Sequence, residues 1–137
     1  MSDAPQEPGG SVQIDVQTLQ EWLKCKRPPL LLDVREAWEV ALARINPRAG
    51  GEATLGTSLQ NASEPELKNW LHMPMSEVTG RYESLDRSQP IVCYCHHGMR
   101  SLQVVAFLMH HGFDSVYNLV GGIDAWSQLI DPSVPRY

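Results

Sequence analysis

The sequence has few cysteines, no long apolar run and no basic stretch, and each absence excludes a class of protein. Its three cysteines are an odd number at a spacing unlike a disulfide scaffold, so we expect reduced thiols in a reducing compartment. No apolar run approaches the length of about 20 residues that a membrane-spanning helix needs. The net charge of -5 and the lack of a basic stripe argue against general nucleic-acid binding. The first eight residues lack the basic and apolar parts of a signal peptide, so we expect a cytoplasmic protein.

What is present suffices for one compact domain with a core of its own, because the chain has 137 residues. We expect a disordered leader over residues 1–10, a folded domain over 11–130 and a polar tail over 131–137. Within the domain, residues 46–69 are rich in glycine, proline and small polar residues. This composition predicts a long loop insertion, of a kind that is uncommon in compact domains.

Apolar runs alternate with segments of helical periodicity along the domain. The expected strands are 11–14, 30–34, 70–73, 91–95 and 115–119, and the expected helices are 15–26, 36–43, 76–85, 102–112 and 123–130. In the second helix, Ala37, Val40 and Ala41 form the expected apolar side. The alternation predicts an α/β fold, with a parallel sheet covered by helices on both faces. Ligands of such sheets bind outside the carboxyl ends of the strands.

Cys95 stands at the carboxyl end of a central predicted strand, and a short loop and then a helix follow it. In this arrangement the N–H groups of the loop and the helix N-terminus converge to form an anion site. Such a site stabilises a thiolate, which is the nucleophile, and also a persulfide, Cys–S–S⁻. Gly98 permits the positive φ that the loop needs, and Ser101 can cap the helix or donate to the sulfur. This interpretation requires a thiol that is not sealed off and N–H groups that point at it.

The other loop residues add positive charge or hydrogen-bond donors around Cys95. The expected persulfide-binding loop consists of His96, His97, Gly98, Met99, Arg100 and Ser101. Arg100 is a candidate anion ligand, with an outward, solvated pose as the alternative. Adjacent ligands on a tight loop rarely close a tetrahedral metal site, so the two histidines and the two nearby cysteines predict no metal.

Three further residues near Cys95 have a structural and a functional interpretation. Asp33 and Arg35 close a strand at the ligand-facing edge, where they form an ion pair or loop anchor or else contact the substrate. Cys93 lies two residues before Cys95 on the same strand face, deeper in the fold. We expect it to be a core residue, with a resolving thiol as the alternative.

Three segments resemble the rhodanese family, and they occur in the order of that family. Residues 91–101, Ile-Val-Cys-Tyr-Cys-His-His-Gly-Met-Arg-Ser, look like its active-site segment. Residues 31–36, Leu-Leu-Asp-Val-Arg-Glu, look like its Asp-x-Arg segment, and residues 116–126 resemble its Gly-Gly…Trp segment. The resemblance covers roughly residues 11–130, with 46–69 unmatched. It implies a rhodanese-like, five-stranded parallel sheet with helices on both faces.

The resemblance also implies a ping-pong sulfurtransferase that needs no cofactor. Cys95 would take sulfur from thiosulfate or another persulfide donor and pass it to a thiol acceptor. Either partner can be a protein, and we expect neither nucleic acid nor a membrane as a partner. The loop from Cys95 to Arg100 counts six residues, a length that suits sulfur transfer in related families, whereas one residue more suits phosphate or arsenate. A sulfur-relay module with little thiosulfate activity, a phosphatase or arsenate reductase of similar fold, and a non-catalytic interaction domain stay open as alternatives.

Overall fold

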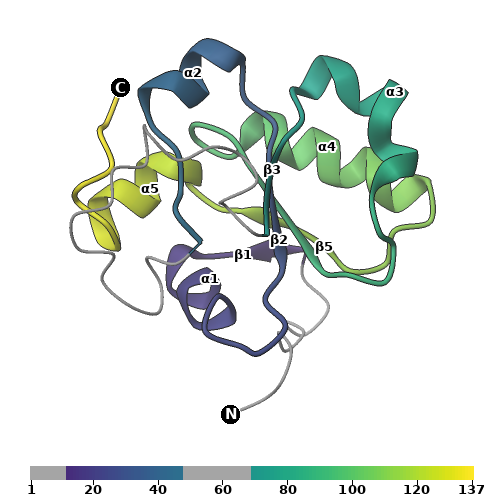
Figure 1. Cartoon of the computed structure of the whole chain (residues 1–137), viewed down its shortest axis with the longest axis horizontal. Coiled ribbons are helices and arrows are strands. Elements are labelled where there is room, and N and C mark those ends of the chain that lie inside the picture. Colours follow the sequence, from purple (N-terminus) through teal and green to yellow (C-terminus); the bar gives the residue numbers. More distant parts are fainter. Residues whose placement is uncertain (1–11, 48–68) are drawn as a thin grey trace.

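A five-stranded parallel sheet forms the centre of the fold (Figure 1), in a computed structural model that describes residues 12–47 and 69–137. The strands are β1 (Gln13–Ile14), β2 (Leu30–Asp33), β3 (Trp70–His72), β4 (Ile91–Tyr94) and β5 (Val116–Leu119). Their order in the sheet is β1-β5-β4-β2-β3, and all four neighbouring pairs run parallel. The sequence-based prediction of a five-stranded parallel sheet is therefore confirmed. The predicted leader at 1–10 and most of the predicted insertion at 46–69 lie outside the described residues.

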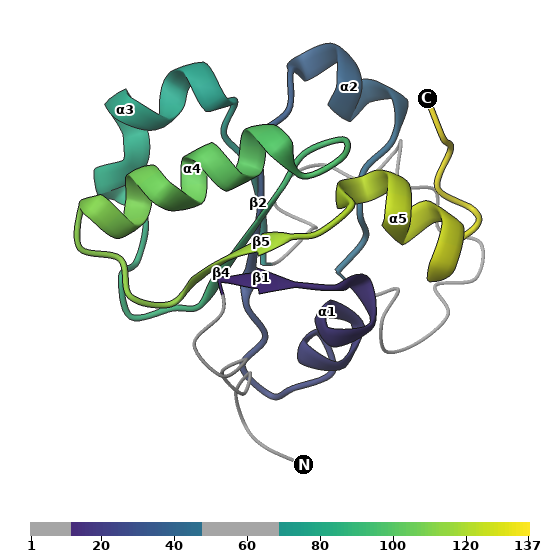
Figure 2. The same ribbon diagram turned by 180° about the vertical axis from the view of Figure 1, so that it is seen from behind.

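Helices cover the two faces of the sheet and create two cores (Figures 1 and 2). The helices are α1 (Val16–Trp22), α2 (Ala37–Leu42), α3 (Val78–Arg81), α4 (Met99–His110) and α5 (Gly122–Leu129). One core joins α1 and α5 to the side chains of Val92 and Tyr94. The other joins α3 and α4 to Ile91, Cys93 and Cys95. The odd and even positions of β4 thus serve opposite cores, as the period of two in a strand requires.

Two predicted helices end differently in the structure. Asp15 caps α1 as expected, because its Oδ1 accepts from the Thr18 N–H at 2.8 Å. The helix nevertheless ends at Trp22 and not near Lys26, because the N–H groups of Lys24 and Cys25 bond to carbonyls three residues back and tighten the chain into a turn. The expected helix over 76–85 is divided into a 3₁₀ turn, the short α3 and a second 3₁₀ turn.

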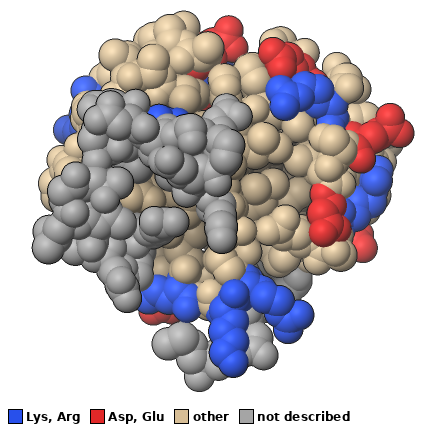
Figure 3. Space-filling view, in the orientation of Figure 1, with Lys and Arg blue, Asp and Glu red and all other residues tan. Residues whose placement is uncertain are grey.

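Helix length and surface charge relate to the two expectations that the chain neither spans a membrane nor binds nucleic acids in general. Within the described residues, every helix falls short of the length and apolarity that crossing a bilayer requires. On the face that Figure 3 shows, basic side chains gather at the lower edge, while acidic and basic side chains lie side by side along the right edge. This face carries mixed charge, in keeping with the net charge of -5.

Candidate active site

Cys95 follows the last residue of β4, and its sulfur faces the start of α4. The Sγ atom accepts from the Gly98 N–H at 3.1 Å and from the Ser101 N–H at 3.4 Å. Gly98 stands before the first turn of α4 with a φ of 103°, a conformation that favours glycine. The predicted convergence of N–H groups on the sulfur is therefore present. These donors can hold negative charge on Sγ or on a second sulfur attached to it.

Asn118 from β5 fixes the far side of this loop. Its side-chain amide donates to the Gly98 carbonyl at 3.1 Å and to Gln13 Oε1 at 2.9 Å. The Ser101 hydroxyl makes a short hydrogen bond to Asn118 Oδ1 and also lies 3.4 Å from Cys95 Sγ. A hydroxyl has one proton, so the shorter contact assigns it to Asn118. Sequence reasoning missed Asn118, although a buried asparagine in an otherwise apolar strand is a detectable signal.

The start of α5 holds the backbone of the loop from the other side. The Ile123 N–H donates to the Cys95 carbonyl at 2.9 Å, and the Asp124 N–H donates to the His96 carbonyl at 3.1 Å. A Cβ atom on Gly122 would lie 2.5 Å from the His96 carbonyl oxygen and closer still to that of Cys95. Glycine at this position therefore lets α5 approach the loop closely enough for both hydrogen bonds.

The thiol itself is not open to solvent. Cys95 is only 1 % exposed and belongs to the apolar core on the α4 side of the sheet. The expectation of an unsealed thiol is therefore wrong for this conformation, because the sulfur points back toward the loop amides instead of outward. The other requirement, N–H groups that point at the sulfur, is met by Gly98 and Ser101.

Arg100 pairs with Glu39, a residue that sequence reasoning missed, and remains partly exposed. Its Nη1 and Nη2 donate to the two carboxylate oxygens of Glu39 at 2.6 and 2.8 Å. The Arg100 hydrogen bonds lower the pKa of Glu39 to about 2, against the opposing effect of burial. The predicted apolar side of α2 is wrong for Ala37 and Ala41, which are exposed, whereas Val40 packs against the core; Glu39 is the buried residue of this helix. Glu36 and Glu39 form a capping box, and this spacing was the available signal.

Tyr137 links the Glu39 carboxylate to Arg35. Its hydroxyl donates to Glu39 Oε2 at 2.8 Å and accepts from Arg35 Nη1 at 2.9 Å. The ring of Tyr137 also stacks on His96 at 4.0 Å between centroids. Residues 131–137, expected to be a tail, thus contribute a side chain to the site.

Asp33 and Arg35 form a buried ion pair that starts at the carboxyl end of β2. The Arg35 Nε and Nη2 donate to the two Asp33 oxygens at 2.8 and 2.6 Å, and both side chains are fully buried. Burial alone would lower the pKa of Arg35, but its hydrogen bonds to Asp33 outweigh this effect and raise it. Tyr94 donates to Asp33 at 2.8 Å and accepts from the Trp70 ring N–H at 2.8 Å. Arg35 also donates to the carbonyls of Glu39 and Ala43, so the contacts of the pair match the alternative of a structural ion pair.

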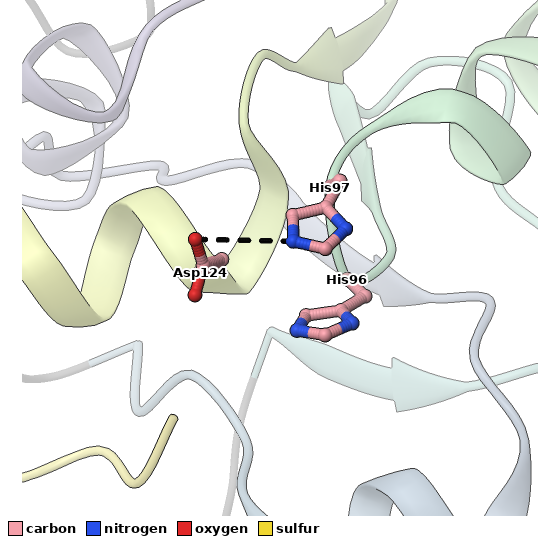
Figure 4. Close-up of side chains that lie close together, drawn as sticks. All are labelled: His96, His97 and Asp124. Carbon is pink, nitrogen blue, oxygen red and sulfur yellow. Dashed lines mark ion pairs between the residues drawn. The ribbon is translucent and has the colours of Figure 1, made fainter. Parts of the chain in front are cut away.

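His96 and His97 of the loop lie close to Asp124 of α5 (Figure 4), with one ligand atom from each of the three within 4.8 Å of the others. The two imidazole rings stack at 3.9 Å with an interplanar angle of 24°. Nearly parallel rings direct their lone pairs along separate planes, and the Asp124 carboxylate already accepts from Arg136 at 3.0 Å. This geometry counts against a shared metal ion. Burial, followed by the neighbouring His97, lowers the pKa of His96 and favours its neutral form.

The remaining predicted residues occupy the rim and the core. Met99 is 72 % exposed at the start of α4, and His97 is also exposed. Cys93 is fully buried, and burial raises the pKa of its thiol. This burial agrees with a core role for Cys93.

A rhodanese-like domain family model matches residues 15–129 of the chain. A thiosulfate sulfurtransferase GlpE of Coxiella burnetii is 36% identical over 63 residues, which make up 46% of this chain and 59% of that protein. The match thus spans less than two thirds of that relative's length. A sulfurtransferase of Allochromatium vinosum is 31% identical over 116 residues, covering 85% of this chain and 88% of that protein.

Solved structures show the same fold. A rhodanese-like domain protein from Staphylococcus aureus superposes with a TM-score of 0.65 at 23% identity, covering 91% of this chain and 97% of its own. The human single-domain sulfurtransferase TSTD1 superposes with a TM-score of 0.62 at 19% identity, covering 88% and 98% of the two chains. At these identities the two structures support the fold alone.

Proposed function

We propose, because this chain belongs to the rhodanese-like domain family, that Cys95 carries sulfane sulfur as a persulfide from a donor to a thiol acceptor. The family and its named relatives make the protein a member of a sulfurtransferase family. The observation that carries the proposal is the pair of N–H groups, from Gly98 and Ser101, that point at the Cys95 sulfur. They lie at the N-terminus of the 12-residue helix α4, where negative charge is stabilised.

The chemistry proceeds in two displacement steps. The Cys95 thiolate attacks the outer sulfur of the donor, whose S–S bond breaks while a new S–S bond forms at Cys95. With thiosulfate, sulfite leaves with the electron pair of the broken bond. The thiolate of the acceptor then attacks the outer sulfur of the persulfide, and Cys95 leaves as a thiolate. The amides that hold charge on Sγ in the first step hold it on the leaving Sγ in the second.

Mass spectrometry of the intact protein tests this proposal. The wild-type chain is treated separately with thiosulfate and with a low-molecular-weight persulfide. We expect the added mass of one sulfur atom, lost on reduction and mapped to Cys95. Cys93→Ser is the matched control, since it removes a neighbouring thiol and should leave the loading intact. Full loading or turnover in Cys95→Ser would refute the proposal.

A protein-to-protein sulfur relay is the second candidate, because large apolar side chains are exposed on elements that flank the loop. Trp38 of α2 is 63 % exposed and Met99 of α4 is 72 % exposed. Such side chains are enriched at protein interfaces. Loading of Cys95 from a persulfidated protein, much faster than from thiosulfate, would favour the relay. Hydrolysis of a phosphate ester without any sulfur loading would instead favour the phosphatase alternative.

A further inference from the structure

The arginines packed around the loop have carboxylate partners. The three pairs are Arg100 with Glu39, Arg35 with Asp33 and Arg136 with Asp124. Each guanidinium is thus matched by a carboxylate within 3.0 Å, so these pairs bring little net positive charge to the region of Cys95. The donors on the sulfur itself are backbone N–H groups, which carry only partial charges.

Arg100 belongs to the same loop as Cys95, and its partner Glu39 is almost completely buried. The side chain of Glu39 is 3 % exposed, and that of Arg100 is 34 % exposed. Besides Arg100, the carboxylate accepts from the Glu36 N–H at 3.0 Å and from the Tyr137 hydroxyl at 2.8 Å. A carboxylate with this many donors in a buried position is costly to separate from its partner. The pair therefore behaves as one unit with almost no net charge.

The neutral Arg100–Glu39 pair limits the negative charge that the site can bind. Thiosulfate brings two negative charges, whereas a persulfide anion, R–S–S⁻, brings one. The loop amides can accommodate one developing charge on sulfur, but a second charge meets no unpaired cation from Arg100. We propose that Glu39, by neutralising Arg100, makes the Cys95 site select monoanionic persulfide donors over dianionic thiosulfate. The inference rests on the proposed function and narrows its donor class, with Glu39 as a positioning residue.

The step with a persulfide donor balances without an oxidant. The Cys95 thiolate attacks the outer sulfur of R–S–S⁻, the donor S–S bond breaks, and a new S–S bond forms at Cys95. The leaving thiolate, R–S⁻, keeps the electron pair and takes one proton from water. The products are the Cys95 persulfide anion, R–SH and the hydroxide that the water leaves, so charge and sulfur are both conserved.

Donor selectivity in Glu39→Gln tests the inference. The readout is kcat/KM with thiosulfate divided by kcat/KM with 2-mercaptoethanol persulfide, whose single charge lies on its terminal sulfur. Removing the carboxylate leaves the positive charge of Arg100 without its neutralising partner. We expect the ratio to rise roughly tenfold, which is the Coulomb effect of one unit charge on the extra negative charge of thiosulfate at about 10 Å and a dielectric constant of about 25. The rise should shrink at high salt. Glu21→Gln, on the exposed face of α1, makes the same chemical change far from the loop and should leave the ratio unchanged.

Two further variants separate charge from structure. Arg100→Gln leaves the Glu39 charge unpaired and should lower the ratio, while the double variant Glu39→Gln/Arg100→Gln should return it toward the wild-type value. Thermal melts confirm that each variant is folded. A purely structural role would slow both donors alike and leave the ratio constant, which would overturn the inference. Failure of both donors to load wild-type Cys95 would instead overturn the proposed function.

Discussion

Gly122→Ala should damage the fold and the site together, because Gly122 lies where α5 touches the active-site loop. A Cβ atom there would lie 2.5 Å from the His96 carbonyl oxygen and 2.7 Å from its carbonyl carbon. Both obstacles are backbone atoms, so no side-chain rotation relieves the contact. The residue also has a φ of 59°, a left-handed conformation that costs alanine about 1 kcal/mol or more.

The expected loss of stability follows from these contacts. To make room, α5 must move away from the loop, and the hydrogen bonds to the Cys95 and His96 carbonyls lengthen. Each lost hydrogen bond costs about 1 kcal/mol. Together with the backbone strain, we expect the free energy of unfolding to fall by about 3 kcal/mol. For a domain of this size, that corresponds to a fall in melting temperature of roughly 10 °C.

Urea unfolding and sulfur loading of Cys95 measure the two effects. Because α5 fixes the loop backbone, loading should slow by more than about tenfold even at temperatures where the variant is folded. Gly80→Ala is the matched control: it lies in α3, no heavy atom lies within 4 Å of its added Cβ, and helix propensity predicts a gain of up to about 1 kcal/mol. Wild-type stability and loading in Gly122→Ala would refute the reasoning.

Three further predictions concern buried polar and thiol groups. Arg100 lowers the pKa of Glu39 from 4.5 to about 2, so their pairing stabilises the fold above pH 4.5 and is lost as the pH falls toward 2. Glu39→Gln should therefore flatten the acid limb of a stability–pH profile, and an unchanged limb would contradict this. Burial raises the pKa of Cys93, so of the two buried thiols iodoacetamide should modify Cys95 before Cys93 in the native protein, as peptide mapping would show. Tyr94→Phe removes the hydroxyl that accepts from the buried Trp70 ring N–H. The variant should therefore lower the free energy of unfolding by about 1–3 kcal/mol in urea melts.

The strands and the position of the thiol follow from local patterns in the sequence. Residues 91–95 are apolar throughout and residues 30–34 are apolar apart from Asp33, and the structure places both strands inside the sheet, away from its edges. Asp15 caps its helix, and Gly98 adopts the positive φ that the loop requires. These features depend on neighbouring residues in the chain, so a sequence reveals them. Helix ends are harder to predict from the sequence, because the turn after Trp22 depends on whether each N–H bonds to the carbonyl three or four residues earlier.

The tertiary structure alone decided what surrounds the sulfur. Glu39 and Arg100 are separated by 61 positions, yet they form the ion pair that sets the charge beside Cys95. Asn118 and Tyr137 reach the site from β5 and from residues beyond α5, and the 1 % exposure of Cys95 results from packing against the core. A sequence determines the periodicity that forms strands and helices, because that depends on near neighbours. Ion pairing and burial depend on distances through space, which are defined only when the elements pack.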